Sequence, residues 1–165
     1  MQIVIASGNK VRLTDLTIQS LISQFAYTQN SRETHTKGLL AYIDPFDFLC
    51  NTSSPATIRR IEQETGPLDF AALKKAGLPE LQLQKVGTEY KTIGHEGRHR
   101  MVALGNAGYH LVPTILSFFN AVDFSGPQQF TIQPQSHDGG FRTLNVTAYP
   151  ISYAGERDLA STFKR

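Results

Sequence analysis

One stretch, residues 94–117 (GHEGRHRMVALGNAGYHLVPTILS), limits the possible folds of this chain more than any other. Its first seven residues hold two histidines, two arginines, a glutamate and two glycines. An amphipathic run, a glycine and a β-branched run with one proline follow. This order predicts a charged loop, then a helix that ends at Gly108, and then a strand.

The charged loop has the features of an anion-binding site. Gly94 and Gly97 allow positive φ angles and a close approach of the backbone to a ligand. Arg98, His99 and Arg100 lie where the helix begins, so free N–H groups and cationic side chains are expected to converge there. We therefore expect phosphate or another anion to bind at this loop. The alternative is a helix start whose arginines form surface salt bridges.

The helix that follows is expected to bury one face. Met101, Val102, Leu104 and Ala107 recur at helical spacing, which leaves the charged residues at the mouth of the site. In the strand after the helix, Pro113 suggests a sheet edge or an irregular start, because proline has no N–H to donate.

The loop, the helix and the strand together resemble a known family. Residues 97–100 (GRHR), then Ala103, a glycine and a VPTIL strand are similar to the G-x-[HR]-R-x-x-A motif of the ParB/sulfiredoxin superfamily. In that family a strand pair leads into this loop, and the loop holds the phosphates of a nucleotide. The strands expected at 81–86 and 90–93 fit this order, and residues 39–49 are similar to the family's opening strand and its I-x-P turn.

The resemblance implies an α+β fold in a single domain that spans residues 1–165. The ParB/sulfiredoxin-like core is expected over residues 38–118, as a small mixed sheet with flanking helices. An N-terminal strand-helix extension over residues 1–37 and a C-terminal β-hairpin extension over residues 119–165 complete the expected organisation.

The activities implied by the resemblance all use the phosphate-binding loop. They are hydrolysis of a nucleoside triphosphate such as ATP or CTP, phosphoryl transfer to a small hydroxyl substrate, and nuclease action, with Mg²⁺ as a metal cofactor. Sulfiredoxin chemistry is not expected, because the position of that family's reactive cysteine is Arg98 here. The chain shows no helix-turn-helix or dimerising tail, which is typical of stand-alone versions of the fold in phages and mobile elements.

Roles within the loop follow from the chemistry of the side chains. Arg98 and Arg100 can each contact phosphate oxygens through two nitrogens, and His99 can donate to a phosphate or act as acid or base. Glu96 is the only carboxylate in the motif and is the candidate general base or metal contact, and the alternative is that it orients an arginine. The expected phosphate-binding set is Gly94, His95, Gly97, Arg98, His99 and Arg100.

Two further carboxylates, Asp44 and Asp47, flank Pro45 on a predicted turn. They are candidates for a divalent metal site beside the phosphate, and Asp47 is a candidate catalytic residue. The alternative is that they cap a helix or accept hydrogen bonds from backbone amides.

A second class of function remains open, namely a catalytically inert module that binds DNA or a host protein and regulates it. A net charge of +2 and a pI near 8.7 are too mild to establish nucleic-acid binding. A second acidic group near the loop would favour the enzyme. Asp44 and Asp47 are the candidates for this group.

His137 and Asp138 lie at the tip of a hairpin predicted over residues 130–149. They could reach a neighbouring site, but turn chemistry accounts for Asp138 and Gly139 without a function.

The N-terminal residues have a weaker alternative resemblance. Residues 2–6 predict a strand, residues 7–9 a turn, and residues 13–25 a helix. The segment IASGNKVRL is similar to the phosphate-binding segment of the inosine-triphosphate pyrophosphatases, although Arg12 replaces the lysine expected there and the family's acidic motifs are missing.

Composition adds the remaining limits. A chain of 165 residues with 40% hydrophobic residues is long enough for one domain with its own core. The single cysteine, Cys50, excludes an internal disulfide and is expected to be buried and inert. No apolar run approaches the roughly 18 residues of a membrane span, so we expect no membrane partner and a cytoplasmic monomer or small homo-oligomer, in the host cell if the chain is phage-encoded.

Overall fold

The computed structural model describes residues 4–6, 10–12, 37–69, 71–72, 76, 78–118 and 128–152. In chain order its elements are β1 (Val4–Ala6), β2 (Lys10–Arg12), β3 (Lys37–Ile43), α3 (Pro45–Thr52), α4 (Pro55–Glu64), β4 (Glu80–Val86), β5 (Glu89–Glu96), α6 (Arg98–Asn106), β6 (Val112–Phe118), β7 (Gln128–Gln133) and β8 (Leu144–Ser152). None of these helices is long and apolar enough to cross a membrane.

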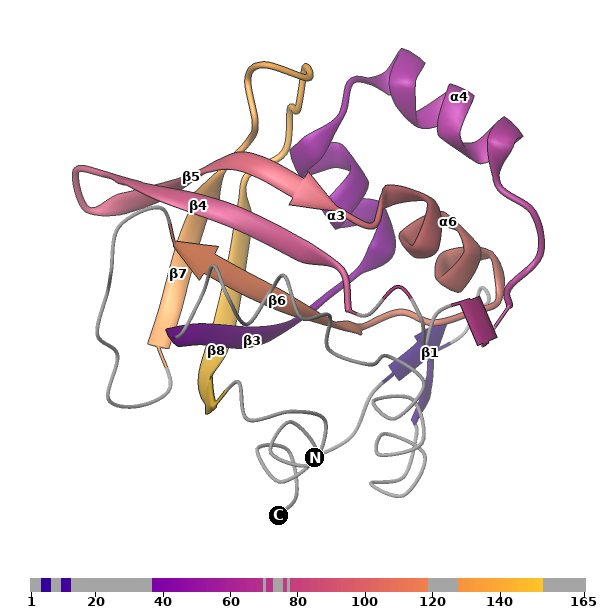
Figure 1. The fold of residues 1–165 in the computed structure, drawn as a ribbon, viewed down its shortest axis with the longest axis horizontal. Helices are drawn as coiled ribbons and strands as arrows, with labels where there is room; N and C mark the ends of the chain where they lie inside the picture. The colour runs from indigo at the N-terminus through magenta and orange to yellow at the C-terminus, as the bar shows by residue number, and fades with distance from the viewer. Residues whose placement is uncertain are drawn as a thin grey trace.

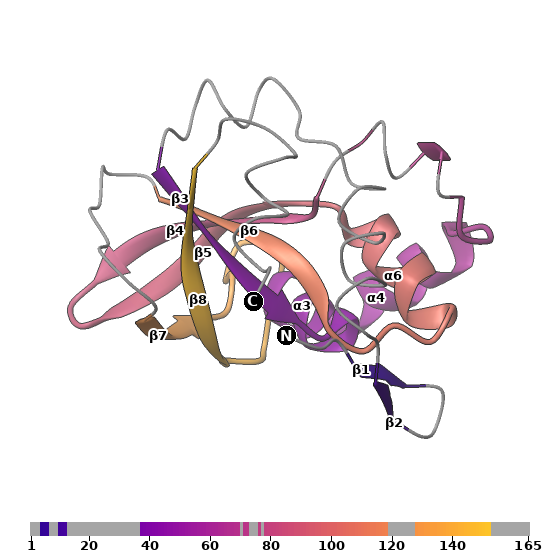
Figure 2. The ribbon, with the colours of Figure 1, turned by 90° about the horizontal axis from the view of Figure 1, so that it is seen from below.

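Six strands form a closed barrel in the order β3-β6-β4-β5-β7-β8. β3 pairs antiparallel with both β6 and β8, and the pairing of β3 with β8 closes the barrel. β4 runs parallel to β6, and β5 runs parallel to β7. Helices α3, α4 and α6 lie together on one side of the barrel, and the β4–β5 turn projects away from them (Figure 1, Figure 2). The mixture of α and β structure is as expected.

The hairpin expected over residues 81–93 is confirmed. β4 and β5 pair antiparallel, and Val86 pairs with Glu89 across a two-residue turn. Gly87, the first residue of the turn, has a φ of 65°, which glycine adopts without steric cost. Because β5 continues to Glu96, it leads the charged loop directly into α6.

The second expected hairpin, over residues 130–149, is confirmed as the antiparallel pair β7 and β8. It is part of the barrel rather than an extension, because β8 also pairs with β3 and β7 also pairs with β5. Pairing on both sides satisfies the backbone groups of these strands and leaves the barrel without exposed edges.

The strand after α6 is confirmed as β6, but it does not lie at an edge. Every residue of β6 is buried, and the strand pairs with β3 on one side and β4 on the other. Pro113 pairs in register with Tyr42 of β3, whereas the ladder with β4 begins only at Ile115. Proline is tolerated here because it precedes the ladder with β4. Of the two predicted positions for Pro113, the irregular strand start is therefore right and the sheet edge is wrong.

The barrel is filled by apolar side chains, including a group of three aromatic rings. Tyr90 contacts Phe118 and Phe130 edge to face, with ring centroids 5.4 and 5.0 Å apart. Met101 and Leu104 of α6 belong to the same core, as expected. Ala107 is exposed, so its predicted burial is wrong. It follows the last turn of α6 as the C-cap residue and is no longer on the buried face.

A second, smaller cluster holds the three helices together. Its members are Leu49, Cys50, Ile58, Ile61 and Val102. Burial raises the pKa of the Cys50 thiol, so this side chain stays protonated near neutral pH. The expectation of a buried cysteine is confirmed.

At the N-terminus, β1 and β2 form an antiparallel pair in which Val4 faces Arg12. The predicted strand is therefore confirmed for residues 4–6. The turn predicted over residues 7–9 and the helix predicted over residues 13–25 lie outside the described residues, and so do residues 7–9 and 13 of the segment similar to the pyrophosphatases.

One buried side chain, Asn51, fixes α3 to the barrel. Its Nδ2 donates to the carbonyl oxygens of Ile132 at 3.3 Å and Arg142 at 2.9 Å, and its Oδ1 accepts from the hydroxyl of Thr92 at 2.7 Å. Its own carbonyl oxygen accepts from the backbone N–H of Gln135. Asn51 is fully buried, so each of these groups would be costly to leave unpaired.

The segment between β7 and β8 is docked on the end of α3. The carbonyl oxygen of Cys50, which lacks a partner within the helix, accepts from the backbone N–H of Phe141. The backbone at Gly140 passes so close to α3 that a Cβ there would overlap the carbonyl oxygen of Asn51. Glycine is therefore required at this position, and the β7–β8 segment has a fixed place beside α3.

We predict that Asn51→Ala lowers the free energy of unfolding by about 3 kcal/mol, because the Thr92 hydroxyl and two carbonyl oxygens lose their buried partner. Urea denaturation followed by circular dichroism measures this change. The matched control is Asn145→Ala, which removes an exposed hydrogen bond to Thr131 and should cost less than about 0.5 kcal/mol. Equal losses in the two variants would contradict the role assigned to Asn51.

Candidate functional site

Gly97 sets up the start of α6, as the sequence predicts. It is the N-cap residue, with a φ of 107° and a ψ of 24°, a conformation that other residues rarely adopt. A Cβ there would also lie 3.0 Å from the Cβ of Pro79 and 3.1 Å from the Cζ of Arg100. No side chain caps α6, so the N–H groups of its first turn are not satisfied in this way.

The other glycine of the loop, Gly94, has a different role from the one expected. It lies within β5 and is not among the described glycines with positive φ, so that expectation is wrong. A Cβ at Gly94 would overlap the side chain of Gln82 on the neighbouring strand β4. Gly94 thus leaves room for the Gln82 side chain beside an irregularity in the pairing of β4 with β5.

Arg98 and His99 contact different partners. Arg98 Nη1 donates to Ser53 Oγ at 3.0 Å and lies 3.8 Å from Asp138 Oδ2. His99 Nε2 lies 3.4 Å from Glu64 Oε1, where α4 ends. Successive positions on a helix point about 100° apart, so neighbouring basic residues cannot all face one anion.

Arg100 turns back toward the end of β5. Its Nη2 lies 3.2 Å from Glu96 Oε1, and its Nη1 donates to the carbonyl oxygen of Ala76 at 3.5 Å. Its side chain is only 13% exposed, and this burial lowers the pKa of Arg100, opposed mainly by Glu96. Arg100 therefore links the loop to Ala76 and pairs with Glu96. This matches the alternative in which the arginines at the helix start form salt bridges.

His95 and Asp138 form a close pair next to Arg98. His95 Nε2 and Asp138 Oδ2 are 3.1 Å apart. Burial lowers the pKa of His95 below its usual 6.5, and the hydrogen bond from His95 lowers the pKa of Asp138. At neutral pH the imidazole is therefore uncharged and Asp138 is ionised. Because a carboxylate only accepts, Nε2 carries the hydrogen and Nδ1 keeps its lone pair.

The turn that carries Asp138 is held in place by α3 and by its own residues. The carbonyl oxygen of Asp138 accepts from the N–H of Ser54 at 3.0 Å, and its Oδ2 accepts from Gln135 Nε2 at 3.5 Å. Gly139 has a φ of 77°, as its turn requires. The Oε1 atom of Gln135 is buried without a hydrogen-bond partner among the described residues. Asp138 therefore belongs to the turn and also contacts His95, at the end of β5.

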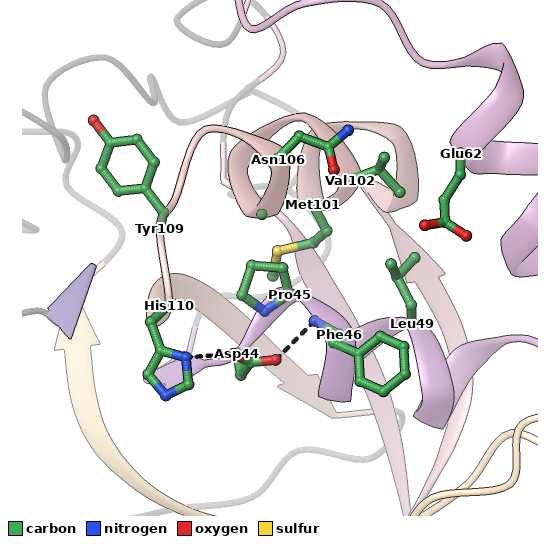
Figure 3. Close-up of a pocket in the computed structure, with 11 residues that line it drawn as sticks. Asp44, Pro45, Phe46, Leu49, Glu62, Met101, Val102, Asn106, Tyr109 and His110 are labelled. Atoms are coloured by element: carbon green, nitrogen blue, oxygen red, sulfur yellow. Dashed lines mark hydrogen bonds and ion pairs between the residues drawn. The ribbon is translucent and has the colours of Figure 1, made fainter. Parts of the chain in front are cut away.

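Asp44 and Asp47 do not form a metal site with the charged loop. Asp44 Oδ1 caps α3 by accepting from the N–H groups of residues 46 and 47, and Asp44 Oδ2 lies 2.7 Å from His110 Nδ1 (Figure 3). Asp47 Oδ1 accepts from Arg142 Nη1 at 2.6 Å. Across the described residues no three metal-ligating side chains come together. Three of these four carboxylate oxygens are therefore engaged within the protein, and the cap alternative is confirmed for Asp44.

The structure adds residues that the sequence did not single out as site residues. Ser53 is fully buried and receives the hydrogen bond from Arg98, Gln135 contacts Asp138, and Glu64 faces His99. They come from separate elements, so no local spacing could identify them. We call His95, Arg98, Ser53 and Asp138 the His95 cluster.

We predict that His95 titrates below pH 6.5 and that Asp138→Asn lowers its pKa further, because the carboxylate that favours the charged imidazole is removed. Proton NMR of the imidazole as a function of pH measures both values. The unfolded chain binds this proton more readily than the folded chain, so stability should also fall as the pH drops below about 6.5. Glu89→Gln, at the β4–β5 turn, is the control and should leave the titration unchanged. A His95 pKa above 6.5, or one that rises in Asp138→Asn, would contradict the proposed pair.

No family model, no curated protein and no solved structure matches this chain. These comparisons therefore place the chain in no family. The chemistry of the His95 cluster and of the α6 N-terminus is the basis for a functional proposal.

Proposed function

We propose that the chain binds a phosphate group of a nucleotide or nucleic acid at the N-terminus of α6 and hydrolyses the bond between its phosphorus and a leaving oxygen. The observation that carries the proposal is the uncapped start of α6 beside Arg98 and His95. Backbone N–H groups and the positive end of the helix dipole favour an anion at such a place. Gly97 contributes no side chain that would cover it.

Arg98 has the capacity to add a second contact to the same anion. Its Nη1 makes both of its contacts, with Ser53 and with Asp138. Its Nε and Nη2 atoms have no partner among the described residues, and the side chain is 20% exposed. A guanidinium that is already held by one nitrogen loses little further freedom when the others bind phosphate oxygens.

The His95–Asp138 pair supplies the base in this proposal. Water attacks the phosphorus, its proton passes to His95 Nδ1, and the bond from phosphorus to the leaving oxygen breaks with its electron pair. Asp138 fixes the imidazole through Nε2 and stabilises the imidazolium that forms. Arg98 and the N–H groups of α6 stabilise the charge that develops on the phosphate oxygens. His95 thereby takes the base role that the sequence suggested for Glu96, which contacts Arg100 instead.

The resemblance to the ParB/sulfiredoxin superfamily supports the choice of ligand. It rests on residues 97–100 and Ala103, which run from the N-cap of α6 into its second turn. On this basis we propose ATP or CTP, or the phosphate backbone of DNA, as the first ligands to test.

A second candidate function is an inert module that binds DNA or a protein through the same surface. One observation favours it, namely that each basic side chain at the start of α6 already faces a carboxylate. Arg98 lies near Asp138, His99 near Glu64, and Arg100 near Glu96. Such balanced pairs stabilise a surface without a ligand and weaken its attraction for phosphate.

We predict that ATP, CTP or a short DNA duplex raises the melting temperature of the wild-type chain through binding to the native state. Arg98→Ala should weaken this binding about tenfold or more, because a charged contact to phosphate is lost. The control is Arg60→Ala, which removes an exposed arginine that pairs with Glu64 on α4. A shift that Arg98→Ala and Arg60→Ala reduce equally would rule out binding at α6.

We further predict that His95→Gln lowers the rate of phosphate release at saturating ligand by about 100-fold, because the general base is lost. The melting shift with the same ligand should remain, since His95 acts on water and not on binding. The assay measures phosphate release or strand cleavage with and without added Mg²⁺. Binding without any hydrolysis by the wild-type chain would contradict the enzyme and support the inert module.

A further inference from the structure

A pocket of about 210 Å³ lies on the helical side of the molecule (Figure 3). Helices α3, α4 and α6 and the segment that leads into β6 all contribute to it. Its lining residues are Asp44, Pro45, Phe46, Leu49, Glu62, Met101, Val102, Gly105, Asn106, Tyr109 and His110. An apolar cavity of about 150 Å³ in another protein holds benzene, so this volume suits a ligand of the size of one substituted ring.

The floor of the pocket is apolar and formed by buried side chains. Met101 is fully buried, and Leu49 and Val102 are each 4% exposed. Phe46 forms a wall and is 55% exposed, which is unusual for a phenylalanine. The guanidinium of Arg142 lies over its ring, 5.1 Å from the centroid, and helps to hold the ring in place.

The charge of the pocket comes from carboxylates. No lysine or arginine is among its described lining residues. Asp44 is already engaged by His110 and by the backbone of α3. Glu62 is exposed and has no hydrogen-bond or ion-pair partner in the described part of the chain. Figure 3 shows its carboxylate on the side of the pocket opposite the Asp44–His110 pair, with apolar side chains between them.

We propose that this pocket binds a small organic cation, a primary ammonium carried on a compact ring. The ring would lie on the apolar floor next to Phe46, and the ammonium would donate to Glu62. An anion would be repelled by Glu62, and a wholly apolar group would cover this carboxylate without offering it a donor. A ring-bearing ammonium satisfies both the apolar floor and the single unpaired charge.

The pocket and the proposed phosphate site are independent. The pocket uses residues 101–106 in the second half of α6, whereas the phosphate site uses its first turn. Neither test depends on the other.

The test is a titration of the full chain with probes that share one ring, followed by ¹H–¹⁵N NMR at the amides of Val102 and Gly105. Benzylamine should give saturable shifts, benzyl alcohol should bind about tenfold more weakly, and benzoate should not bind. Glu62→Gln should weaken benzylamine about three- to fivefold and leave benzyl alcohol unchanged. The matched control is Glu64→Gln, which makes the same change two residues away outside the pocket and should alter benzylamine binding by less than about twofold.

A linear cation tests the requirement for a ring separately from the requirement for an ammonium group. Nα-acetyl-lysine amide carries the ammonium without a ring and should bind more weakly than benzylamine, because it covers less of the apolar floor. Equal binding of this probe would overturn the requirement for a ring. Equal binding of benzyl alcohol or benzoate, equal losses in Glu62→Gln and Glu64→Gln, or no saturable shift with benzylamine would overturn the site.

Discussion

Every polar atom of the Asn51 side chain is used inside the protein, and three segments that are distant in sequence meet there. The amide contacts Thr92 on β5, Ile132 on β7 and Arg142 before β8. A buried amide of this kind accepts only one arrangement of its neighbours, because any other leaves a donor or acceptor unpaired. It therefore fixes the β7–β8 segment against α3, and with it the distance from Asp138 to His95.

Electrostatics at the start of α6 follow from this arrangement. Burial keeps His95 neutral, Asp138 balances Arg98, and Glu96 balances Arg100. The side-chain charges nearly cancel here, so the positive potential that can attract an anion comes from the oriented backbone N–H groups. Binding of an anion here would depend weakly on salt concentration and strongly on the direction in which the N–H groups point. The mild overall charge of +2 is consistent with this balance.

Local features of the fold could be predicted because local sequence encodes them. The hairpin around Gly87, the start of α6 at Gly97 and its end at Gly108 each rest on a glycine with positive φ. Barrel closure could not be predicted, since the pairing of β3 with β8 joins segments about a hundred residues apart and leaves no periodic signal. The candidate site could be predicted only in part from the sequence. Turn chemistry alone explained Asp138, and only the docked loop shows that it reaches His95.

Barrel closure also orders events during translation. β3 is made early but cannot complete its pairing until β8 has left the ribosome. At roughly 5 to 20 residues per second, the intervening hundred or so residues take roughly 5 to 20 seconds. Until β6 has been made both edges of β3 are open, and the edge that pairs with β8 stays open to the end of the interval, as an unpaired strand edge of the kind that chaperones shield. The β4–β5 hairpin can form meanwhile, yet His95 has no carboxylate partner until Asp138 emerges. A partly made chain therefore lacks the assembled His95 cluster.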